Sequence, residues 1–393
     1  MSGADAAGRW SARAELAERA VRSRHLRPLW LLPGTLLGVP GWPATAAQRL
    51  FGPWNYWWQA HVLDCLVDAY LRTPDPQRRL RVSRFVAGVR RRNGRGWRND
   101  YYDDMAWLAL ALQRAELYVG VRRPGAVASL AEALRGGWTA DAGGGIWWRI
   151  RDKYDEDFKN VPANGPAAIL FARLRDPRAY AVAGWIERHL VDRATGVVWD
   201  GLHAGPDGGI REIETLRYTY CQGVYLGACL ELAAWGEDGE SAAWAERAAR
   251  TVDAVIAHLT VPADAKPDPD TPDANAGPTA SGAPPLVLKG QGGGDGGLFA
   301  GILARYLAQA ALALPDYGPG FARTAYLAAD VVFDSARAAW DHRAPGPGGP
   351  VLGPEWSRPA DPPRRRRSPE RDLSVQAGGW MLLESAALLA RSL

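Results

Sequence analysis

Two stretches decide the fold: Leu298–Leu314, LFAGILARYLAQAALAL, and Ser241–Leu259, SAAWAERAARTVDAVIAHL. A helix with the first pattern is apolar on almost every side and is buried, whereas a helix with the second has one charged face and covers a core. The buried kind recurs at 167–174, 222–234 and 378–390. Alternation of the two kinds predicts an inner ring of helices wrapped by an outer ring.

Helical spacing of apolar residues extends over about a dozen segments, and β-branched runs of period two are almost absent. The segments lie near 5–24, 54–73, 78–92, 101–119, 124–137, 162–174, 177–190, 216–236, 240–258, 297–314, 320–338 and 372–391. The predicted fold class is therefore all-α, an (α/α)6 toroid of six inner and six outer helices. A solenoid of helical pairs is the structural alternative, and unequal repeat lengths argue against it.

The composition is that of a globular protein. Of the 393 residues, 47% are hydrophobic and 23% charged, which excludes wholesale disorder and a fibrous rod. The net charge of +4 is too small to indicate nucleic-acid binding through the overall field. Cys65, Cys221 and Cys229 lack the spacing of a metal site or a disulfide framework. An excess of Trp, 18 against 7 Phe, indicates flat surfaces for amphipathic ligands such as sugars as well as packing.

We expect a single domain over residues 1–393, with long Pro/Gly-rich loops at about 261–296 and 343–371. The arginine run Arg364–Arg367 is flanked by acids and is interpreted as part of a solvated loop.

The amino terminus has a charged helical pattern in place of a secretory signal, which predicts a cytoplasmic location. The first strongly apolar stretch, Leu29–Val39, is interrupted by Pro33 and Gly34 and is too short to cross a membrane. We therefore expect no membrane span.

Each predicted inner helix starts with a polar or glycine-bearing phrase. The phrases are PWNYWWQ (53–59), NDYYDDMAW (99–107), FKNVPANGP (158–166), RYTYCQG (217–223), GQGGGDGG (290–297) and RDLSVQAGGW (371–380). In a closed ring of hairpins the inner helices run parallel, so these phrases are expected to meet at one mouth. Helix capping is the alternative explanation, but capping does not account for the recurring Tyr, Trp and Gln.

Asp103 and Asp104 form the sharpest of these features. Neighbouring side chains at a helix start point about 100° apart, which places their carboxyl groups on the order of 5–6 Å apart, the separation of a retaining glycosidase. Two carboxyl groups this close repel each other's charge, so one can stay protonated as an acid while the other is ionised as a nucleophile. Paired acids are also common helix caps, so the pair alone is not decisive.

Several motifs in order resemble glycoside hydrolase family 76, the α-1,6-mannanases. They are YYDDMAW, FKN-x-x-ANGPAAILFARL, YTYCQGVYLGACLEL, DGGLFAGIL, GPEWS and SVQAGGWMLLESAA, between about Trp54 and Leu389. The resemblance implies a retaining, endo-acting hydrolase of α-1,6-linked mannan, with Asp103 as nucleophile and Asp104 as general acid/base. The sequence departs from the family at Cys221, where members often have Asn, and at Ala300, where they often have Lys, which puts the subsite preference in doubt.

Hydroxyl groups of a sugar require neutral donors and acceptors that do not disturb the acid pair, and sugar faces require aromatic platforms. The predicted substrate-binding residues are Trp54, Asn99, Tyr102, Asn164, Tyr218, Gln222, Asp295 and Trp356. Lys159 is expected either to brace a carboxylate or to pair with Asp155 or Asp157. No metal and no cofactor are expected.

The expected partner is α-1,6-linked mannan or manno-oligosaccharide, with no nucleic acid and no membrane span; no oligomeric state is predicted. Two alternatives remain open. A terpene-cyclase-like α/α toroid enzyme shares acid-rich phrases and aromatics, although no DDxxD string is present. A non-catalytic glycan-binding toroid would keep the platforms without using the acids.

Overall fold

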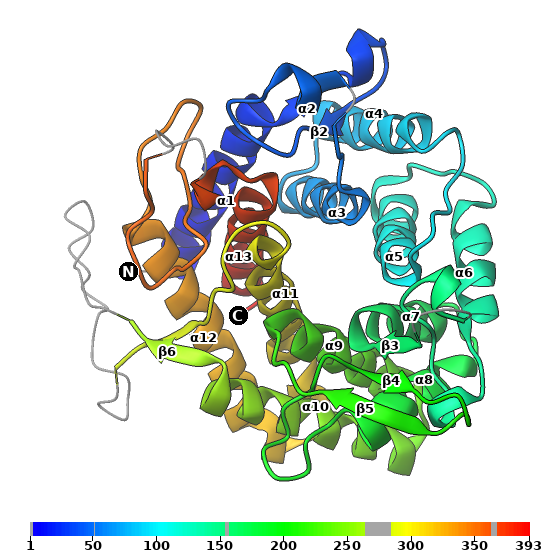
Figure 1. Cartoon of the computed structure of the whole chain (residues 1–393). Coiled ribbons are helices and arrows are strands. Elements are labelled where there is room, and N and C mark those ends of the chain that lie inside the picture. Colours follow the sequence, from blue (N-terminus) through cyan, green and yellow to red (C-terminus); the bar gives the residue numbers. More distant parts are fainter. Residues whose placement is uncertain (1–2, 51, 154–156, 264–283, 363–367) are drawn as a thin grey trace.

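The structure is a computed structural model that describes residues 3–50, 52–153, 157–263, 284–362 and 368–393. In these residues, inner helices pack side by side around a closed ring in which the last contacts the first (Figure 1). They are α3 (Tyr56–Arg72), α5 (Tyr102–Val119), α7 (Val161–Arg173), α9 (Thr219–Trp235), α11 (Gly296–Ala313) and α13 (Leu373–Ser392).

A second layer of helices covers this ring, each packed on the inner helix next to it. They are α1 (Gly3–Arg24), α4 (Pro76–Arg92), α6 (Ala126–Gly137), α8 (Arg178–His189), α10 (Asp238–His258) and α12 (Ala322–Asp341). The all-α toroid prediction is confirmed, and every predicted helix is present with its ends within three residues of the expected positions.

Short elements that the sequence pattern did not predict lie in the connections between the helices of the ring. They are α2 (Ala46–Leu50) and the strands β1 (Leu26–Arg27), β2 (Leu37–Gly38), β3 (Phe158–Asn160), β4 (Gly201–Ala204), β5 (Ile210–Glu214), β6 (Thr260–Pro262) and β7 (Leu286–Leu288). The antiparallel sheets have the orders β1-β2, β3-β4-β5 and β6-β7. Strands this short carry too few residues for a period-two pattern to stand out.

The predicted long loops lie only partly within the described residues. Strands β6 and β7 pair at the base of the first loop, with Val261 opposite Val287. Residues 264–283 of that loop, and the predicted solvated run Arg364–Arg367, lie outside the described residues.

The inner helices approach closely where glycines replace side chains. A Cβ on Gly301 of α11 would lie 2.6 Å from the carbonyl oxygen of Gly378 of α13, and a Cβ on Gly378 would lie 2.1 Å from that of Gly297. Both distances are too short for any side chain. The apolar runs that suggested buried helices therefore also contain the small residues that let two buried helices touch.

Two of the described helical stretches are long and apolar enough to cross a membrane: Gly296–Tyr317 and Leu373–Ser392. In the ring, 78% and 89% of their most apolar windows are buried by protein. Their apolar surface is thus used for packing against neighbouring helices.

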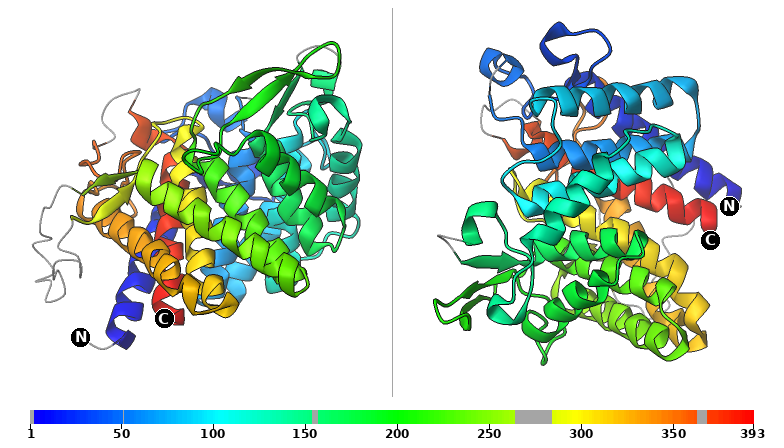
Figure 2. Two further views of the ribbon diagram at one scale, coloured as in Figure 1. Left: turned by 90° about the horizontal axis from the view of Figure 1, so that it is seen from below. Right: turned by 90° about the vertical axis from the view of Figure 1, so that its right-hand side faces the viewer.

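The amino-terminal helix α1 closes the double ring by packing on α13 and α3. Glu18 of α1 is buried and accepts Arg72 Nη2 at 2.8 Å and Arg78 Nη2 at 2.9 Å. Arg72 also donates through Nε to Glu384 of α13 at 3.0 Å. Both chain termini lie at one end of the ring, opposite the β4–β5 hairpin (Figure 2).

A second buried ionic cluster crosses the centre of the ring. Arg114 of α5 donates to Asp64 at 2.5 Å and to Asp68 at 2.6 Å, and both acids belong to α3. Arg305 of α11 contacts the remaining oxygen of each acid, at 2.7 and 2.5 Å. Two positive and two negative charges are thereby neutralised, and three inner helices are tied together.

We predict that Arg305→Met lowers the free energy of unfolding by about 3–5 kcal/mol, because two buried carboxylates are then left with Arg114 as their one shared cation and carry an uncompensated charge. Arg305→Lys keeps the charge but not both bonds, and should cost less. The control Arg122→Met breaks only the exposed pair with Glu116 and should cost below about 1 kcal/mol. Urea unfolding measures all three, and equal losses for Arg305→Met and Arg122→Met would contradict this role.

Candidate active site

Asp103 and Asp104 lie in the first turn of α5, at the end of the ring where the inner helices begin. The helix start is held from two sides: Asn99 Oδ1 accepts the backbone N–H of Tyr101 at 3.1 Å, and the backbone N–H of Tyr102 donates to the carbonyl of Trp148 at 2.9 Å. Both acids are half-buried. The local geometry therefore fixes the backbone that carries the acid pair.

The two carboxyl groups differ in the donors they receive. Each oxygen of Asp103 accepts one N–H: Oδ1 from the backbone of Asp104 at 2.8 Å, and Oδ2 from the Trp148 indole at 3.1 Å. Asp104 accepts the Asn99 amide at Oδ2 at 2.5 Å, and its Oδ1 has no hydrogen-bond donor among the described residues. Donors on both oxygens favour the ionised form, so Asp103 is the better-stabilised carboxylate.

Burial and nearby charges raise the pKa of both carboxyl groups, in the direction that keeps the proton on Asp104. Burial, and then the charge of Asp200, raise the pKa of Asp103 to about 7, against the opposing effect of its N–H donors. Burial raises the pKa of Asp104 well above its ordinary value, and the charges of Asp103 and Asp295 add to the rise. The charge of Asp103 is thus one cause that keeps the proton on Asp104, and the two groups titrate as a pair.

Asp200 supplies a third carboxyl group that the sequence analysis did not select. The thiol of Cys221 donates to its Oδ1 at 3.6 Å. Burial first, and the charge of Glu214 as a weaker cause, raise the pKa of Asp200 to about 6, while the Cys221 thiol opposes this rise. Cys221, the departure from the family pattern noted in the sequence, thus donates to a carboxyl group near Asp103.

Asp295 precedes α11 and joins the same mouth. Its Oδ1 accepts the indole N–H groups of Trp57 at 3.0 Å and Trp58 at 2.7 Å, both from α3. The polar phrases at the starts of α3 and α11 are therefore in direct contact, as expected.

Aromatic rings fill the centre of the ring just inside the mouth. Trp57 lies 6.5 Å from Trp107, 6.4 Å from Tyr220 and 6.1 Å from Phe299, between ring centroids. Tyr220 and Phe299 stack at 3.9 Å with their planes 4° apart. We call Trp57, Trp107, Tyr220 and Phe299 the aromatic floor. Its members come from four inner helices, α3, α5, α9 and α11.

Asn164 and Gln222, which were predicted to bind substrate, bind the protein's own backbone instead. Asn164 accepts the N–H of Ile146 and donates to its carbonyl, both at 2.8 Å, and also donates to the Asn160 carbonyl. Gln222 holds Val198 in the same way, at 2.8 and 2.7 Å. Both side chains are fully buried and thus out of reach of a sugar hydroxyl.

The same arrangement occurs on two further inner helices. Gln59 of α3 exchanges hydrogen bonds with both backbone groups of Gly38, and Gln376 of α13 does so with Leu352. In each case the amide stands in the first turn of an inner helix and holds one residue of the connection that precedes that helix. We call this arrangement the amide clamp.

The amide clamps hold the loops of one residue that contacts Asp103, Trp148, and of one whose charge raises its pKa, Asp200. Ile146, held by Asn164, lies two residues before Trp148, the donor to Asp103. Val198, held by Gln222, lies two residues before Asp200. Trp148 and Asp200 could not be selected from the sequence because they lie in loops without a periodic pattern, well before the polar phrases that start at Phe158 and Arg217.

Other predicted residues fall into two groups. Tyr102 and Trp356 are buried: the Tyr102 ring lies against Gly137, and the Trp356 carbonyl accepts the His342 imidazole. Neither ring is available as a sugar platform in this conformation. Trp54 and Tyr218 are half-buried, and Tyr218 packs edge-on against Phe299 at 5.4 Å.

Of the partners expected for Lys159, Asp155 lies outside the described residues. Lys159 is fully buried, and its ammonium group donates to the carbonyls of Asp141 and Gly144, each at 2.7 Å, and lies over the Trp147 ring. It therefore holds the 139–147 segment together. No group of three or more His, Cys, Asp or Glu side chains suited to a metal ion is found within the described part of the chain.

The sequence profile of glycosyl hydrolase family 76 matches residues 41–361, which is most of the chain. The chain belongs to glycosyl hydrolase family 76. Its family and its solved relatives make it a glycoside hydrolase, and a terpene-cyclase-like enzyme is thereby excluded.

Solved structures similar to this family 76 chain agree with the fold. The α-1,6-mannanase GH76A of Salegentibacter sp. HEL1_6 is 30% identical, with a TM-score of 0.73, over 97% of this chain and 99% of that chain. Its inactive variant, with two adjacent aspartates replaced by asparagine, is in complex with α-1,6-mannotriose and is 29% identical, with the same TM-score and coverage. The Lin0763 protein from Listeria innocua is 26% identical, with a TM-score of 0.74, over 96% and 97% of the two chains. No curated protein matches the chain.

We predict that Trp148→Phe moves the acidic limb of the pH profile of kcat/KM to higher pH. The variant removes an N–H donor that favours ionised Asp103, so the pKa of Asp103 rises above about 7 and activity is lost at a higher pH as the solution is acidified. Trp235→Phe, on the outer side of α9, serves as the control. An unchanged acidic limb in Trp148→Phe would exclude this hydrogen bond from the mechanism.

We predict that Asn164→Leu and Gln376→Leu lose similar stability, about 2–4 kcal/mol, because each leaves buried backbone groups of one loop without partners. Only Asn164→Leu should also lower kcat of the folded enzyme, because its loop carries Trp148. Thermal unfolding and kcat measured well below the melting temperature separate the two effects. Equal kcat values would show that the clamps act on stability alone.

Proposed function

We propose that the protein hydrolyses internal α-1,6-mannosidic linkages with retention of anomeric configuration. The observation that carries the proposal is the unequal hydrogen bonding of two adjacent carboxyl groups at the mouth: Asp103 has a donor on each oxygen, whereas Asp104 has one oxygen without a donor among the described residues. This arrangement supports an ionised nucleophile beside a protonated acid.

The relatives support the substrate. The Salegentibacter enzyme is described as an α-1,6-mannanase, and its inactive variants change two adjacent aspartates. Asp103–Asp104 is the one place in this sequence where two aspartates are adjacent. Because inactive variants of the Salegentibacter enzyme also change two adjacent aspartates, the comparison supports Asp103 and Asp104 as the catalytic pair of this chain.

In the first step, the Asp104 carboxylic acid protonates the glycosidic oxygen while an Asp103 carboxylate oxygen attacks the anomeric carbon. The carbon–oxygen bond to the leaving sugar breaks, its electron pair takes the proton, and a glycosyl ester forms on Asp103. In the second step, Asp104, now a carboxylate, removes a proton from water, and the resulting hydroxide displaces Asp103. Two inversions give net retention.

The surrounding residues fit the charge changes of this cycle. Asn99 occupies Oδ2 of Asp104, so the proton is available on Oδ1. Asp200 lies close enough to Asp103 to raise its pKa, and is suited to accept a hydroxyl of the sugar bound there. The aromatic floor, with Tyr218 at its edge, offers faces for sugar rings, and Trp54 is a further half-buried ring just before α3.

We predict that Asp103→Ala and Asp104→Ala each lower kcat/KM on unbranched α-1,6-mannan by at least about 100-fold. Azide should distinguish their roles with an activated mannoside: Asp103→Ala should give the β-mannosyl azide, and Asp104→Ala the α-mannosyl azide. Asp207→Asn, in an exposed turn, is the control and should keep full activity.

Product analysis tests retention of the anomeric configuration and internal cleavage of the polymer. NMR should show the α-anomer first, and early digests of polymer should contain oligosaccharides of many lengths. A β-anomer at first appearance would contradict retention, and release of mannose alone would contradict internal cleavage. Tight mannan binding without turnover would favour the non-catalytic glycan-binding toroid.

A further inference from the structure

An unusually basic segment begins at the outer helix α4. Residues 76–98 contain nine arginines and no aspartate or glutamate. Arg78 and Arg81, near the start of the helix, pair with Glu18. Arg84, Arg91 and Arg95 are exposed and have no carboxylate partner within the described residues. Cations favour the C-terminal turn of a helix, but the dipole acts only over that turn and does not account for Arg84.

The segment between β1 and β2 protrudes from the ring and is fixed directly on this basic face of α4. The backbone N–H of Leu36 donates to the carbonyl of Arg84 at 2.9 Å, and a Cβ on Gly88 would lie 2.0 Å from the Leu36 carbonyl oxygen. Arg84, Gly88 and Arg91 follow one another at helical spacing and so share this face. The segment therefore stands beside the unpaired arginines in a defined position.

The tip of the segment presents apolar side chains to solvent. Leu31 is 87% exposed and Trp30 is 41% exposed, and both have positive φ, 61° and 48°, which is unfavourable for residues other than glycine. The Trp30 indole donates to the carbonyl of Leu50, itself 46% exposed, at 2.8 Å. A strained but anchored apolar tip indicates a contact that is absent from the isolated chain.

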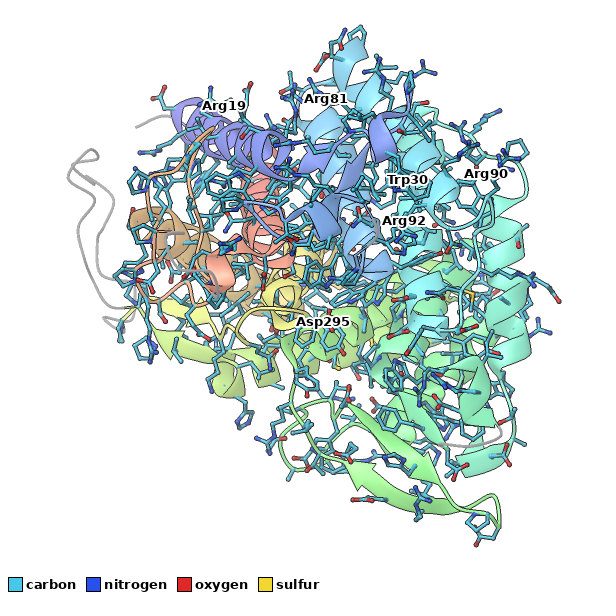
Figure 3. The ribbon with its side chains drawn as sticks, turned by 45° about the horizontal axis from the view of Figure 1, so that its top comes forward. Arg19, Trp30, Arg81, Arg90, Arg92 and Asp295 are labelled. Carbon is cyan, nitrogen blue, oxygen red and sulfur yellow. The ribbon has the colours of Figure 1, made fainter. Side chains whose placement is uncertain are left out.

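Arg92 connects this tip to the mouth of the ring. Its guanidinium lies 5.9 Å from the Trp30 ring and 5.5 Å from the Trp54 ring, and donates to the carbonyl of Gly52 at 3.4 Å. Trp54 stands just before α3, whose first residues reach Asp295. Figure 3 shows Trp30 and Arg92 close together, with Asp295 at the start of α11.

We propose that these residues form a docking surface for an anionic lipid bilayer. The surface consists of Trp30, Leu31, Leu50, Arg84, Arg91, Arg92 and Arg95, and we call it the arginine–tryptophan surface. Arginines supply attraction to anionic headgroups, Leu31 and Leu50 enter the acyl boundary, and Trp30 occupies the interface that tryptophan prefers. A nucleic acid would use the arginines but would leave Leu31 in water, so the bilayer accounts for more of the surface.

Docking would place the mouth of the ring at the membrane. This consequence rests on the proposed function: a glycan attached to an anionic lipid would then reach Asp103 and Asp104 without leaving the bilayer surface. The docking itself does not depend on hydrolysis, so the two fail separately.

Co-sedimentation of the full-length protein with lipid vesicles tests the proposal. We expect binding to vesicles that mix phosphatidylglycerol with phosphatidylcholine, and none to phosphatidylcholine alone. The triple variant Arg84→Glu, Arg91→Glu, Arg95→Glu should bind at least about 100-fold more weakly. Leu31→Ser should bind about tenfold more weakly. Both should keep the wild-type melting temperature and full activity on a soluble manno-oligosaccharide.

The matched control Arg122→Glu, Arg188→Glu, Arg193→Glu changes the net charge equally at exposed positions on other parts of the ring, and should bind vesicles like the wild type. Wild-type protein that stays in solution with anionic vesicles would overturn the proposal. Equal loss in the two triple variants would also overturn it, because net charge alone would then explain binding. Binding to RNA that Leu31→Ser leaves unchanged, with no binding to vesicles, would assign the surface to nucleic acid.

Discussion

A side-chain amide in the first turn of an inner helix donates to, and accepts from, the backbone of one residue in the connection that precedes the helix. Gln59, Asn164, Gln222 and Gln376 all make this contact, each within the described residues. The amide acts as a one-residue extension of β pairing and satisfies backbone groups that burial would otherwise leave without partners. The loops so fixed carry Trp148 and Asp200, so the surroundings of the acid pair depend on this contact.

Side chains inside the ring are arranged in layers along its axis. Acids occupy the mouth, the aromatic floor lies beneath them, and the cluster of Asp64, Asp68, Arg114 and Arg305 crosses the ring deeper along the same helices. Burial raises the pKa of both Asp103 and Asp104, and the ionic cluster joins α3, α5 and α11, three of the four helices that carry the floor. Stability is thus concentrated below the layer where the chemistry is proposed.

Much of the ring could be predicted from the sequence because helical periodicity is repeated over many residues. The alternation of buried and amphipathic stretches gave the two rings, and the polar phrases located the mouth. Partners of individual polar side chains could not be predicted in this way. Asn164 and Gln222 have the residue types that bind sugars, but their partners are backbone groups of loops whose paths no periodicity reveals. Asp200 and Trp148 were missed for the same reason. A sequence also does not distinguish a buried aromatic residue, such as Tyr102 or Trp356, from an exposed one.

The assignment of Asp103 as nucleophile is tested most directly by trapping the covalent intermediate. The enzyme would be incubated with a mannose-configured cyclitol epoxide, and the modified residue would be located by peptide mass spectrometry. We predict a single adduct on Asp103, which forms faster as the pH rises through about 7. An adduct on Asp104 or Asp200, with Asp103 unmodified, would contradict it.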